Sequence, residues 1–264
     1  TLQHSKYKGR LLRPTRFYGE GNRPESLWPT HFTNAIFSDD GGQTWHVSDP
    51  FPEYGTGEAA VVELFDGSGV EWEARILDVR RNDVTLEVLG SEIVSREPAL
   101  QLTLGIALPK GDRQKWVIGK LVELGVYQVV PLVTENGVAQ PVEKAMGRLR
   151  RQVVEASKQC GRNHLMRICE PCTLSVFLEQ QFHQAWIAHP LSAEDVSGIQ
   201  STTVAALSME SGTAGIAIGP EGGFSVTEVS KAMTAGWEPI ELGSRILRIE
   251  TAAMAVAAQL LLGR

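Results

Sequence analysis

Residues 215–225 read GIAIGPEGGFS, and this stretch is the sharpest local pattern in the chain. An apolar strand runs directly into Gly-Pro-Glu-Gly-Gly, and a helix is predicted to begin after Ser225 or Thr227, either of which can cap it. Glycines at a strand end allow a ligand to approach the backbone closely, and this is the edge at which open α/β sheets bind ligands. The stretch therefore predicts a ligand-binding loop, although a plain structural turn would have the same pattern.

The loop does not match the usual nucleotide-binding motifs. It is not Gly-x-Gly-x-x-Gly, and it lacks the Gly-Lys-Ser/Thr ending of a P-loop. Glu221 in its middle would repel a pyrophosphate, whereas a neutral or cationic ligand such as a sulfonium is easier to accommodate.

A second stretch, LGSRILRIETAA at residues 242–253, has a related pattern. A short strand ends in glycine, a loop carries Arg245 and Arg248, and a helix begins with Glu250 in its first turn, where the helix dipole favours an acidic residue. This helix has almost no polar face, so we expect it to be buried on all sides, at a partner subunit or beneath a ligand.

The rest of the C-terminal part alternates strands with helices. Periodicity predicts strands over 100–108, 128–133, 184–188, 215–218 and 239–242, and helices over 113–124, 143–159, 226–235 and 250–262. Asp112 is the expected N-cap of the first helix, and Gly125 its end. This alternation is typical of an α/β domain with a mainly parallel sheet.

The N-terminal part is different. Apolar runs at 59–65, 70–79 and 84–89 are separated by turn residues and predict β-strands of a small barrel or sandwich. We place a β-rich domain at residues 1–96, with an atypical first 55 residues, and the α/β domain at residues 97–264.

Composition limits the class of protein. The chain has 264 residues, of which 42% are hydrophobic and 21% charged, as in ordinary globular proteins. No apolar run approaches the roughly 20 residues that cross a bilayer, and no signal peptide is visible. Three cysteines fit a reducing compartment. We therefore expect a cytoplasmic protein.

The net charge of −6 hides an uneven distribution. Residues 1–23 have six basic residues against one acidic, residues 53–92 have three against ten, and residues 110–167 have eleven against five. A basic band inside an acidic protein can bind phosphate locally, and a solvated helix face would have the same composition.

Four stretches in this order carry a family resemblance: LPKGDRQKWVIGKLVELGVYQVVPLVTENGVA, EASKQCGRN, IGPEGGF and LGSRILRIETAA. They resemble the RsmE family of 16S ribosomal RNA methyltransferases, and the resemblance covers residues 99–262. The resemblance implies a SPOUT-type, trefoil-knotted α/β domain and an N-terminal PUA-like β-barrel that binds RNA. It also implies a homodimer and methylation of the uridine N3 of small-subunit ribosomal RNA by S-adenosylmethionine.

One region departs from the family. Residues 61–76, VVELFDGSGVEWEARI, match the barrel, but residues 31–57 do not contain the usual His, Val-Leu-Arg and Gly-Asp pattern. This departure concerns the RNA contacts and the substrate more than the type of reaction.

The resemblance also implies site residues. Two loops and the end of a third strand would hold the cofactor, largely through backbone atoms: His189, Pro190, Ile218, Gly219, Pro220, Glu221, Gly222, Gly223, Leu242, Gly243, Ile246, Leu247, Arg248, Thr251 and Ala252. The expected RNA contacts lie on and after the basic helix: Arg148, Arg151, Lys158, Arg162 and Asn163.

Methylation at N3 requires loss of a weakly acidic proton. Arg248 and Arg162 are the candidates for stabilising the resulting anion, because arginine stays protonated and cannot be the base. Glu221 is the candidate proton acceptor, with solvent hydroxide and a purely structural Glu221 as the alternatives.

Cys160, His164, Cys169 and Cys172 have spacings that a zinc site could use. Cys160 belongs to a family stretch that needs no metal, and Pro171 stiffens the second pair, so we predict no metal. His31, His46 and His183 have no ligand pattern, and Trp28, Trp45 and Trp72 are expected in packing rather than on RNA bases.

Two other functions stay open at this point. A methyltransferase with the same cofactor could act on a ribose 2′-hydroxyl, and the chain could be a non-catalytic RNA-binding protein.

Overall fold

The computed structural model describes residues 14–16, 33–38, 45–47, 61–79, 84–137, 143–189 and 202–262, the first three ranges as backbone only. Pro190, His31 and Trp28 lie outside these residues, as do the side chains of His46 and Trp45. The chain divides into two compact units: residues 1–96 with 154–165, and residues 97–153 with 166–264. The second unit contains both stretches from which the sequence predicts a ligand site.

The first unit is an antiparallel sheet in the order β1-β2-β3-β6-β5-β4. Its strands are β1 (Pro14–Arg16), β2 (Thr33–Ser38), β3 (Trp45–Val47), β4 (Val61–Phe65), β5 (Val70–Val79) and β6 (Val84–Ile93). Trp72 packs against the small core of Val62, Leu64, Ala74 and Val84, which is the packing role expected for it. The predicted β-rich character is confirmed; among the described strands, β1 and β4 are the edges, so the sheet does not close there.

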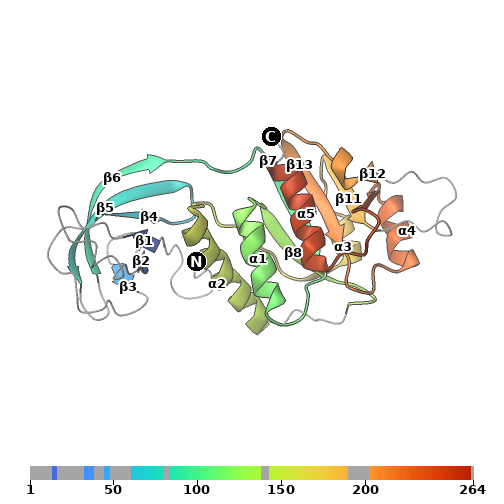
Figure 1. Cartoon of the computed structure of the whole chain (residues 1–264), viewed down its shortest axis with the longest axis horizontal. Helices are drawn as coiled ribbons and strands as arrows, with labels where there is room; N and C mark the ends of the chain where they lie inside the picture. The colour runs from blue at the N-terminus through green and yellow to red at the C-terminus, as the bar shows by residue number, and fades with distance from the viewer. Residues whose placement is uncertain are drawn as a thin grey trace. The chain divides into compact units, whose positions relative to one another are not determined.

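The second unit is built on a parallel sheet in the order β10-β8-β7-β13-β11-β14-β12, with β9 paired to β8 (Figure 1). Its strands are β7 (Leu100–Ile106), β8 (Gln128–Val133), β9 (Arg167–Ile168), β10 (Cys172–Thr173), β11 (Gln184–Ala188), β12 (Thr202–Thr203), β13 (Gly212–Ile218) and β14 (Glu238–Glu241).

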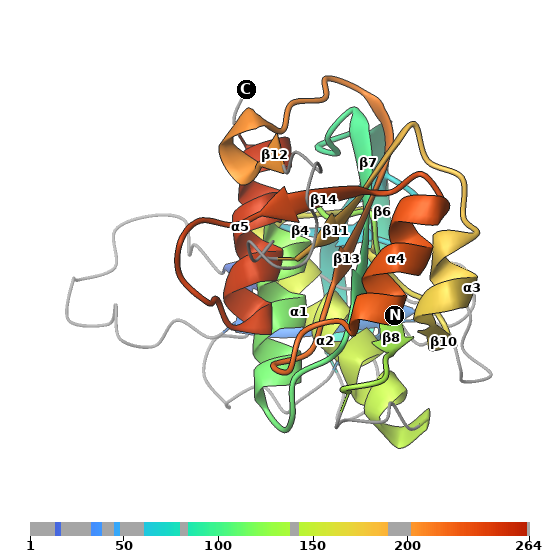
Figure 2. The same ribbon diagram turned by 90° about the vertical axis from the view of Figure 1, so that its right-hand side faces the viewer.

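Helices cover both faces of this sheet. They are α1 (Arg113–Glu123), α2 (Glu143–Cys160), α3 (Leu174–Leu178), α4 (Val226–Thr234) and α5 (Ile249–Leu261), with a 3₁₀ turn, η2 (Val204–Ala206). Figure 2 shows α1 and α5 on one side of the sheet and α3 and α4 on the other. The central strands β7 and β13 are buried along almost their whole length, which explains why they read as continuous apolar runs.

Two strand glycines make room for an aromatic cluster on the α3 and α4 side. A Cβ at Gly105 would lie 2.4 Å from the ring of Phe177, and one at Gly215 would lie 2.4 Å from the ring of Phe182. The centroids of the Phe177 and Trp237 rings are 5.2 Å apart, and Trp237 Nε1 donates to the carbonyl of Leu178 at 3.2 Å. The small residues and the rings therefore fit as one packed layer.

The structure corrects two details of the sequence prediction. Asp112 occupies the N-cap position of α1, but its side chain accepts no capping hydrogen bond. Helix α5 is not buried on all sides in the single chain: Thr251, Met254, Ala255, Ala258, Gln259 and Leu262 are exposed or half-buried. These residues recur at helical spacing, so they form one uncovered stripe.

Candidate functional site

Three neighbouring parallel strands end together at one edge of the second unit. Ala188 at the end of β11 pairs with Ile218 of β13 on one side and with Ile240 of β14 on the other. The loops that follow β13 and β14 therefore leave the sheet side by side. The backbone N–H of His189 donates to the carbonyl of Ile240 at 3.2 Å, so the end of β11 reaches the same edge, as the family resemblance implies.

The loop after β13 is a tight turn with a defined conformation. The N–H of Gly223 donates to the carbonyl of Pro220 at 2.8 Å, and Gly223 has a φ of 70°, which favours glycine. The ring of the buried Phe224 lies over Gly219, where an added Cβ would be 3.1 Å from it. This part of the backbone is therefore fixed from its inner side.

The helix after this loop is capped as the sequence predicts. Ser225 Oγ accepts from the N–H of Glu228 at 3.1 Å, and the Glu228 carboxylate accepts from the N–H of Ser225 at 2.9 Å. The buried Glu228 also accepts from the backbone N–H of Glu135 at 3.0 Å. The capping box thus joins the start of α4 to the segment after β8.

Asn136 is a site residue that the sequence reasoning missed. Its side-chain amide donates to the carbonyls of Gly222 and Gly223, at 3.4 and 3.2 Å. A Cβ at Gly222 would lie 3.2 Å from the Cβ of Asn136. Asn136 belongs to one of the family-like stretches, but its contact with a loop 86 residues away depends on the tertiary structure.

The loop after β14 presents two cations to solvent. Arg245 and Arg248 are exposed, and neither has an ion-pair or hydrogen-bond partner among the side chains that the structure describes. Ile246 between them is 96% exposed. Arg248 is also the N-cap residue of α5, so its backbone is held while its guanidinium is available to an anionic or carbonyl ligand.

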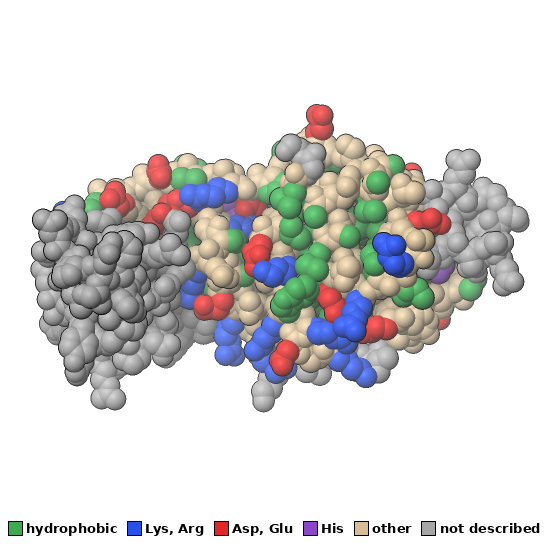
Figure 3. All heavy atoms as spheres, viewed as in Figure 1, with side chains coloured by type: hydrophobic (Ala, Val, Ile, Leu, Met, Phe, Trp, Pro, Cys, Tyr) green, Lys and Arg blue, Asp and Glu red, His purple; other side chains and the backbone are tan. Residues whose placement is uncertain are grey.

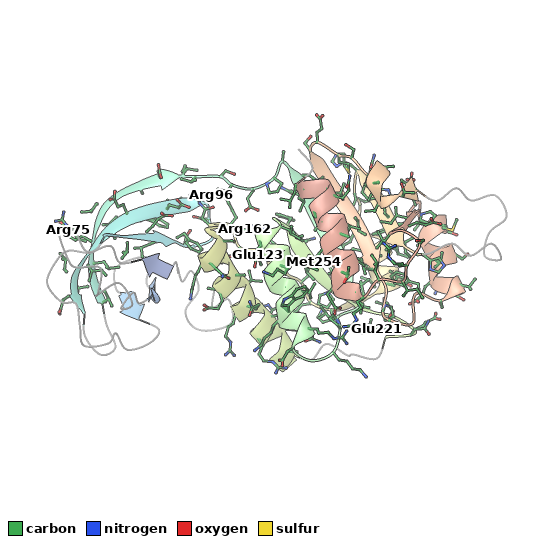
Figure 4. All side chains as sticks on the ribbon, viewed as in Figure 1. Arg75, Arg96, Glu123, Arg162, Glu221 and Met254 are labelled. Atoms are coloured by element: carbon green, nitrogen blue, oxygen red, sulfur yellow. The ribbon has the colours of Figure 1, made fainter. Side chains whose placement is uncertain are left out.

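The cofactor residues predicted at the start of α5 differ in exposure. Thr251 is exposed and Ala252 is buried. Glu221 is at the opposite loop, where its carboxylate forms an ion pair with Arg113 at 3.3 Å, and Figure 4 shows it near the first turn of α5. The two loops, Arg248 and Glu221 are therefore brought together in one unit.

Three residues predicted to contact RNA do not lie on a solvated helix end. Lys158, Arg162 and Asn163 belong to the first unit and are only 5%, 6% and 1% exposed. Lys158 Nζ forms an ion pair with Glu155 at 2.8 Å. Their burial argues against a merely solvated helix end in the single chain. Their RNA role stays a prediction, as does a role for Arg162 in stabilising the anion.

Asn163 is held by Glu71 and by the segment that follows β6. Its amide donates to Glu71 Oε1 at 2.9 Å and to the carbonyl of Val94 at 2.7 Å. Arg96 Nη2 also donates to the buried Glu71, at 3.2 Å, and this hydrogen bond is the main cause that raises the pKa of Arg96. Asn163 therefore stabilises a buried carboxylate of the first unit.

We expect Asn163→Ala to destabilise the first unit by about 2 kcal/mol, because Glu71 and the Val94 carbonyl lose a buried donor. Hydrogen–deuterium exchange of β5 and β6 measures this directly. Arg75→Gln is the control, since the Arg75–Glu87 ion pair is about half exposed and such pairs contribute little. Equal exchange in all three proteins would contradict the structural role of Asn163.

Arg148 and Arg151 differ from these three residues. Both are exposed on α2, in the part of the helix that belongs to the second unit. Arg150 between them forms an ion pair with Glu170 at 2.5 Å. An RNA contact by Arg148 and Arg151 is compatible with their exposure and stays a prediction.

The cysteines do not form a metal site among the described residues, where no group of three or more His, Cys, Asp or Glu side chains is placed to hold an ion. Cys160 donates to the carbonyl of Ser157, and Cys169 to Gln128 Oε1. Burial raises the pKa of the Cys169 and Cys172 thiols, which disfavours the thiolate form that binds metals.

Of the three histidines without a ligand pattern, His183 is the one whose side chain the structure describes. Its Nδ1 forms a hydrogen bond with the hydroxyl of Thr213. No helix among the described residues is long and apolar enough to cross a membrane.

Comparison with known proteins identifies similar chains. Residues 96–261 match the family model of the RNA methyltransferase domain. The ribosomal RNA small subunit methyltransferase E of Synechocystis is 33% identical over 202 residues, which cover 75% of this chain and 64% of that protein. The chain thus spans less than two thirds of this relative. The protein of the same name from Bacillus subtilis is 27% identical over 70% of this chain and 74% of its own length.

Solved structures share the architecture. A Legionella pneumophila protein described as a methyltransferase, solved with bound S-adenosylmethionine, is 32% identical with a TM-score of 0.69 and covers 77% of this chain and 83% of its own. The ribosomal RNA small subunit methyltransferase E of Neisseria gonorrhoeae, also solved with S-adenosylmethionine, is 28% identical with a TM-score of 0.67 and the same two coverages.

Proposed function

The chain belongs to the RNA methyltransferase family, in the RsmE branch with its SPOUT-type α/β fold, and from this premise we propose that it methylates the N3 of a uridine in small-subunit ribosomal RNA. The observation that carries the proposal is the joint end of β13, β11 and β14, where two glycine-containing loops leave the same edge of the sheet and one of them presents exposed arginines. Its methyl donor is S-adenosylmethionine.

The residues at this edge fit such a cofactor. The loops after β13 and β14 offer backbone N–H and carbonyl groups that suit an adenine and a ribose. The absence of a side chain at Gly222 lets the backbone of the first loop lie against Asn136. Glu221, about half exposed at the loop, favours a cationic ligand over a phosphate. S-adenosylmethionine, when bound, supplies a methyl group on a positively charged sulfur.

Arg248 has the central chemical role in this proposal. The proton on uracil N3 must leave, and the negative charge that develops spreads to the two flanking carbonyl oxygens. An exposed guanidinium without an ion-pair partner among the described residues can donate to such an oxygen without giving up an ion pair to a described residue. Glu221 is the carboxylate at the loop and stays the candidate proton acceptor, with solvent hydroxide as the alternative.

The assembly that we propose is a homodimer. Apart from Thr251 and Gln259, the uncovered stripe on α5 consists of alanine and larger apolar side chains, and Met254 lies on it (Figure 4). Figure 3 shows hydrophobic side chains gathered in a band over this helix and its neighbour α1, where Trp116 is 49% exposed. A continuous apolar band of this kind marks a protein interface, and sedimentation equilibrium measures whether the chain is dimeric.

RNA binding is assigned to residues 1–96 and to Arg148 and Arg151 of the methyltransferase domain, residues 97–264. The basic charge of residues 1–23 supports the first assignment. A ribosomal RNA substrate also supports a cytoplasmic location.

The experiment that tests the proposed cofactor is calorimetric titration of the purified protein with S-adenosylmethionine and S-adenosylhomocysteine. We expect saturable binding of both, with one site per chain. A folded protein that binds neither, with or without ribosomal RNA present, would exclude the methyltransferase and favour a non-catalytic RNA-binding role.

A further inference from the structure

Arg113 joins the two carboxylates that lie at the proposed cofactor site. It is the first residue of α1, and its two terminal nitrogens point to different partners. Nη2 donates to Glu221 Oε1 at 3.3 Å, and Nη1 donates to Glu250 Oε1 at 3.4 Å. The partners come from the loop after β13 and from the first turn of α5, 108 and 137 residues further along the chain.

The two contacts differ in burial, so they differ in what they can do. The side chain of Glu250 is 9% exposed, whereas those of Arg113 and Glu221 are 40% and 52% exposed. Glu250 Oε2 is buried without a hydrogen-bond partner among the described residues, so the contact of Oε1 with Arg113 is the one ion pair that the described residues give this carboxylate. Because an uncompensated buried carboxylate is costly, Glu250 holds the guanidinium in place.

The partner on the exposed side is part of the cofactor loop. Glu221 stands between Pro220 and Gly222, and the carbonyls of Gly222 and Gly223 are held by Asn136. Arg113 therefore holds the loop through the side chain of Glu221, and Asn136 holds it through the backbone carbonyls of Gly222 and Gly223. Neither Arg113 nor Asn136 belongs to the two loops that would surround the ligand.

We propose that Arg113 is a positioning residue for the cofactor: anchored by Glu250, it holds Glu221 and thereby fixes the loop Pro220–Gly223 in the conformation that receives the ligand. This inference rests on the proposed function of the loop. A planar guanidinium suits the task, because its nitrogens are arranged in a rigid fork that can donate to two carboxylates at once.

The alternative is a structural ion pair that only joins α1 to α5. In that case Glu221 would not matter for ligand binding, and the effect of losing Arg113 would appear in stability alone. If Arg113 positions the loop, the effects of changing Arg113 and Glu221 on ligand affinity depend on each other. If the ion pair is only structural, neither change affects ligand affinity.

The test is a double-mutant cycle on the affinity for S-adenosylhomocysteine, measured by calorimetry with the full chain. This ligand lacks the sulfonium charge, so its Kd reports the loop position rather than the change in local charge. We expect Arg113→Gln and Glu221→Gln each to weaken binding about five- to tenfold, and the double variant to bind no more weakly than the weaker single variant. Arg113→Lys is expected to restore part of the affinity, since an ammonium keeps the charge but not the fork.

Lys120→Gln is the matched control. It removes an ion pair of similar exposure from the same helix, Lys120 with Glu123 at 2.8 Å, and is expected to bind as the unchanged protein does. Glu221→Gln keeps the test valid if Arg113→Gln fails to fold, because Glu221 is about half exposed. Unchanged affinity in both single variants, or effects that multiply in the double variant, would overturn the inference; failure of the unchanged protein to bind would instead overturn the proposed function.

Discussion

Replacing Arg248 with glutamine is expected to lower kcat for methyl transfer by about 10²–10³-fold, the loss typical when one donor to a developing oxyanion is removed. The side chain is exposed and has no ion-pair partner among the described residues, so the fold should not change. Steady-state kinetics with saturating S-adenosylmethionine measures the effect.

Whether the loss appears in kcat or in the Kd of the cofactor discriminates between two roles for Arg248. A fall in kcat with little change in the Kd of the cofactor indicates that the guanidinium acts on the nucleobase anion. Lys231→Gln, which removes an exposed charge from α4 of the same unit, is the control and should leave kcat unchanged. An Arg248→Gln protein with full kcat and weaker cofactor binding would assign the residue to the cofactor alone.

Gly222→Trp is expected to weaken S-adenosylmethionine binding by at least about 100-fold. A Cβ at this position already lies 3.2 Å from the Cβ of Asn136, so a large side chain has to displace Asn136 or turn toward the ligand. Displacing Asn136 removes its hydrogen bonds to the carbonyls of Gly222 and Gly223. Either outcome changes the loop at which the cofactor would bind, and calorimetry measures the loss.

The control for this prediction is Gly147→Trp. An added Cβ at Gly147 on α2 would contact nothing within 4 Å, so a large residue there should leave cofactor affinity unchanged. If Gly222→Trp binds S-adenosylmethionine normally and remains folded, the loop after β13 does not form the cofactor site.

The regular elements of the second unit were predictable because their burial is visible in the sequence. The predicted strands at 128–133 and 184–188 agree with β8 and β11 at both ends, and the helix over 143–159 with α2 to within one residue. Buried parallel strands are apolar on both faces, so they stand out from the amphipathic helices between them. The capping of α4 by Ser225 was predictable from local spacing alone.

The short strands were not predictable, for a physical reason. β9, β10 and β12 have two residues each, and such segments are extended only because a neighbouring strand offers backbone partners. The position of β14 between β11 and β12 is likewise set by tertiary structure. The last strand of the chain thus lies between two earlier strands, an arrangement that is compatible with a knotted chain. The trefoil knot itself stays a prediction.

In the candidate site, too, the features encoded locally in the sequence were predictable and those set by tertiary contacts were not. The loops at 218–223 and 242–247 were predictable because glycines and arginines follow apolar runs. Arg113 and Asn136 were missed because their partners lie at least 86 residues away. The burial of Lys158 and Asn163 was not predictable either, because their contacts with Glu155 and Glu71 appear only in the folded chain.

The measurement that tests the central claim most directly is nucleoside analysis of small ribosomal subunits after incubation with the purified protein and isotope-labelled S-adenosylmethionine. The subunits should come from cells that lack the corresponding methyltransferase, so that the target position is unmodified. We expect the label in N3-methyluridine, and much less of it with the Arg248→Gln protein. Label in a 2′-O-methylated nucleoside, or no transfer by a folded protein that binds the cofactor, would contradict the proposed function.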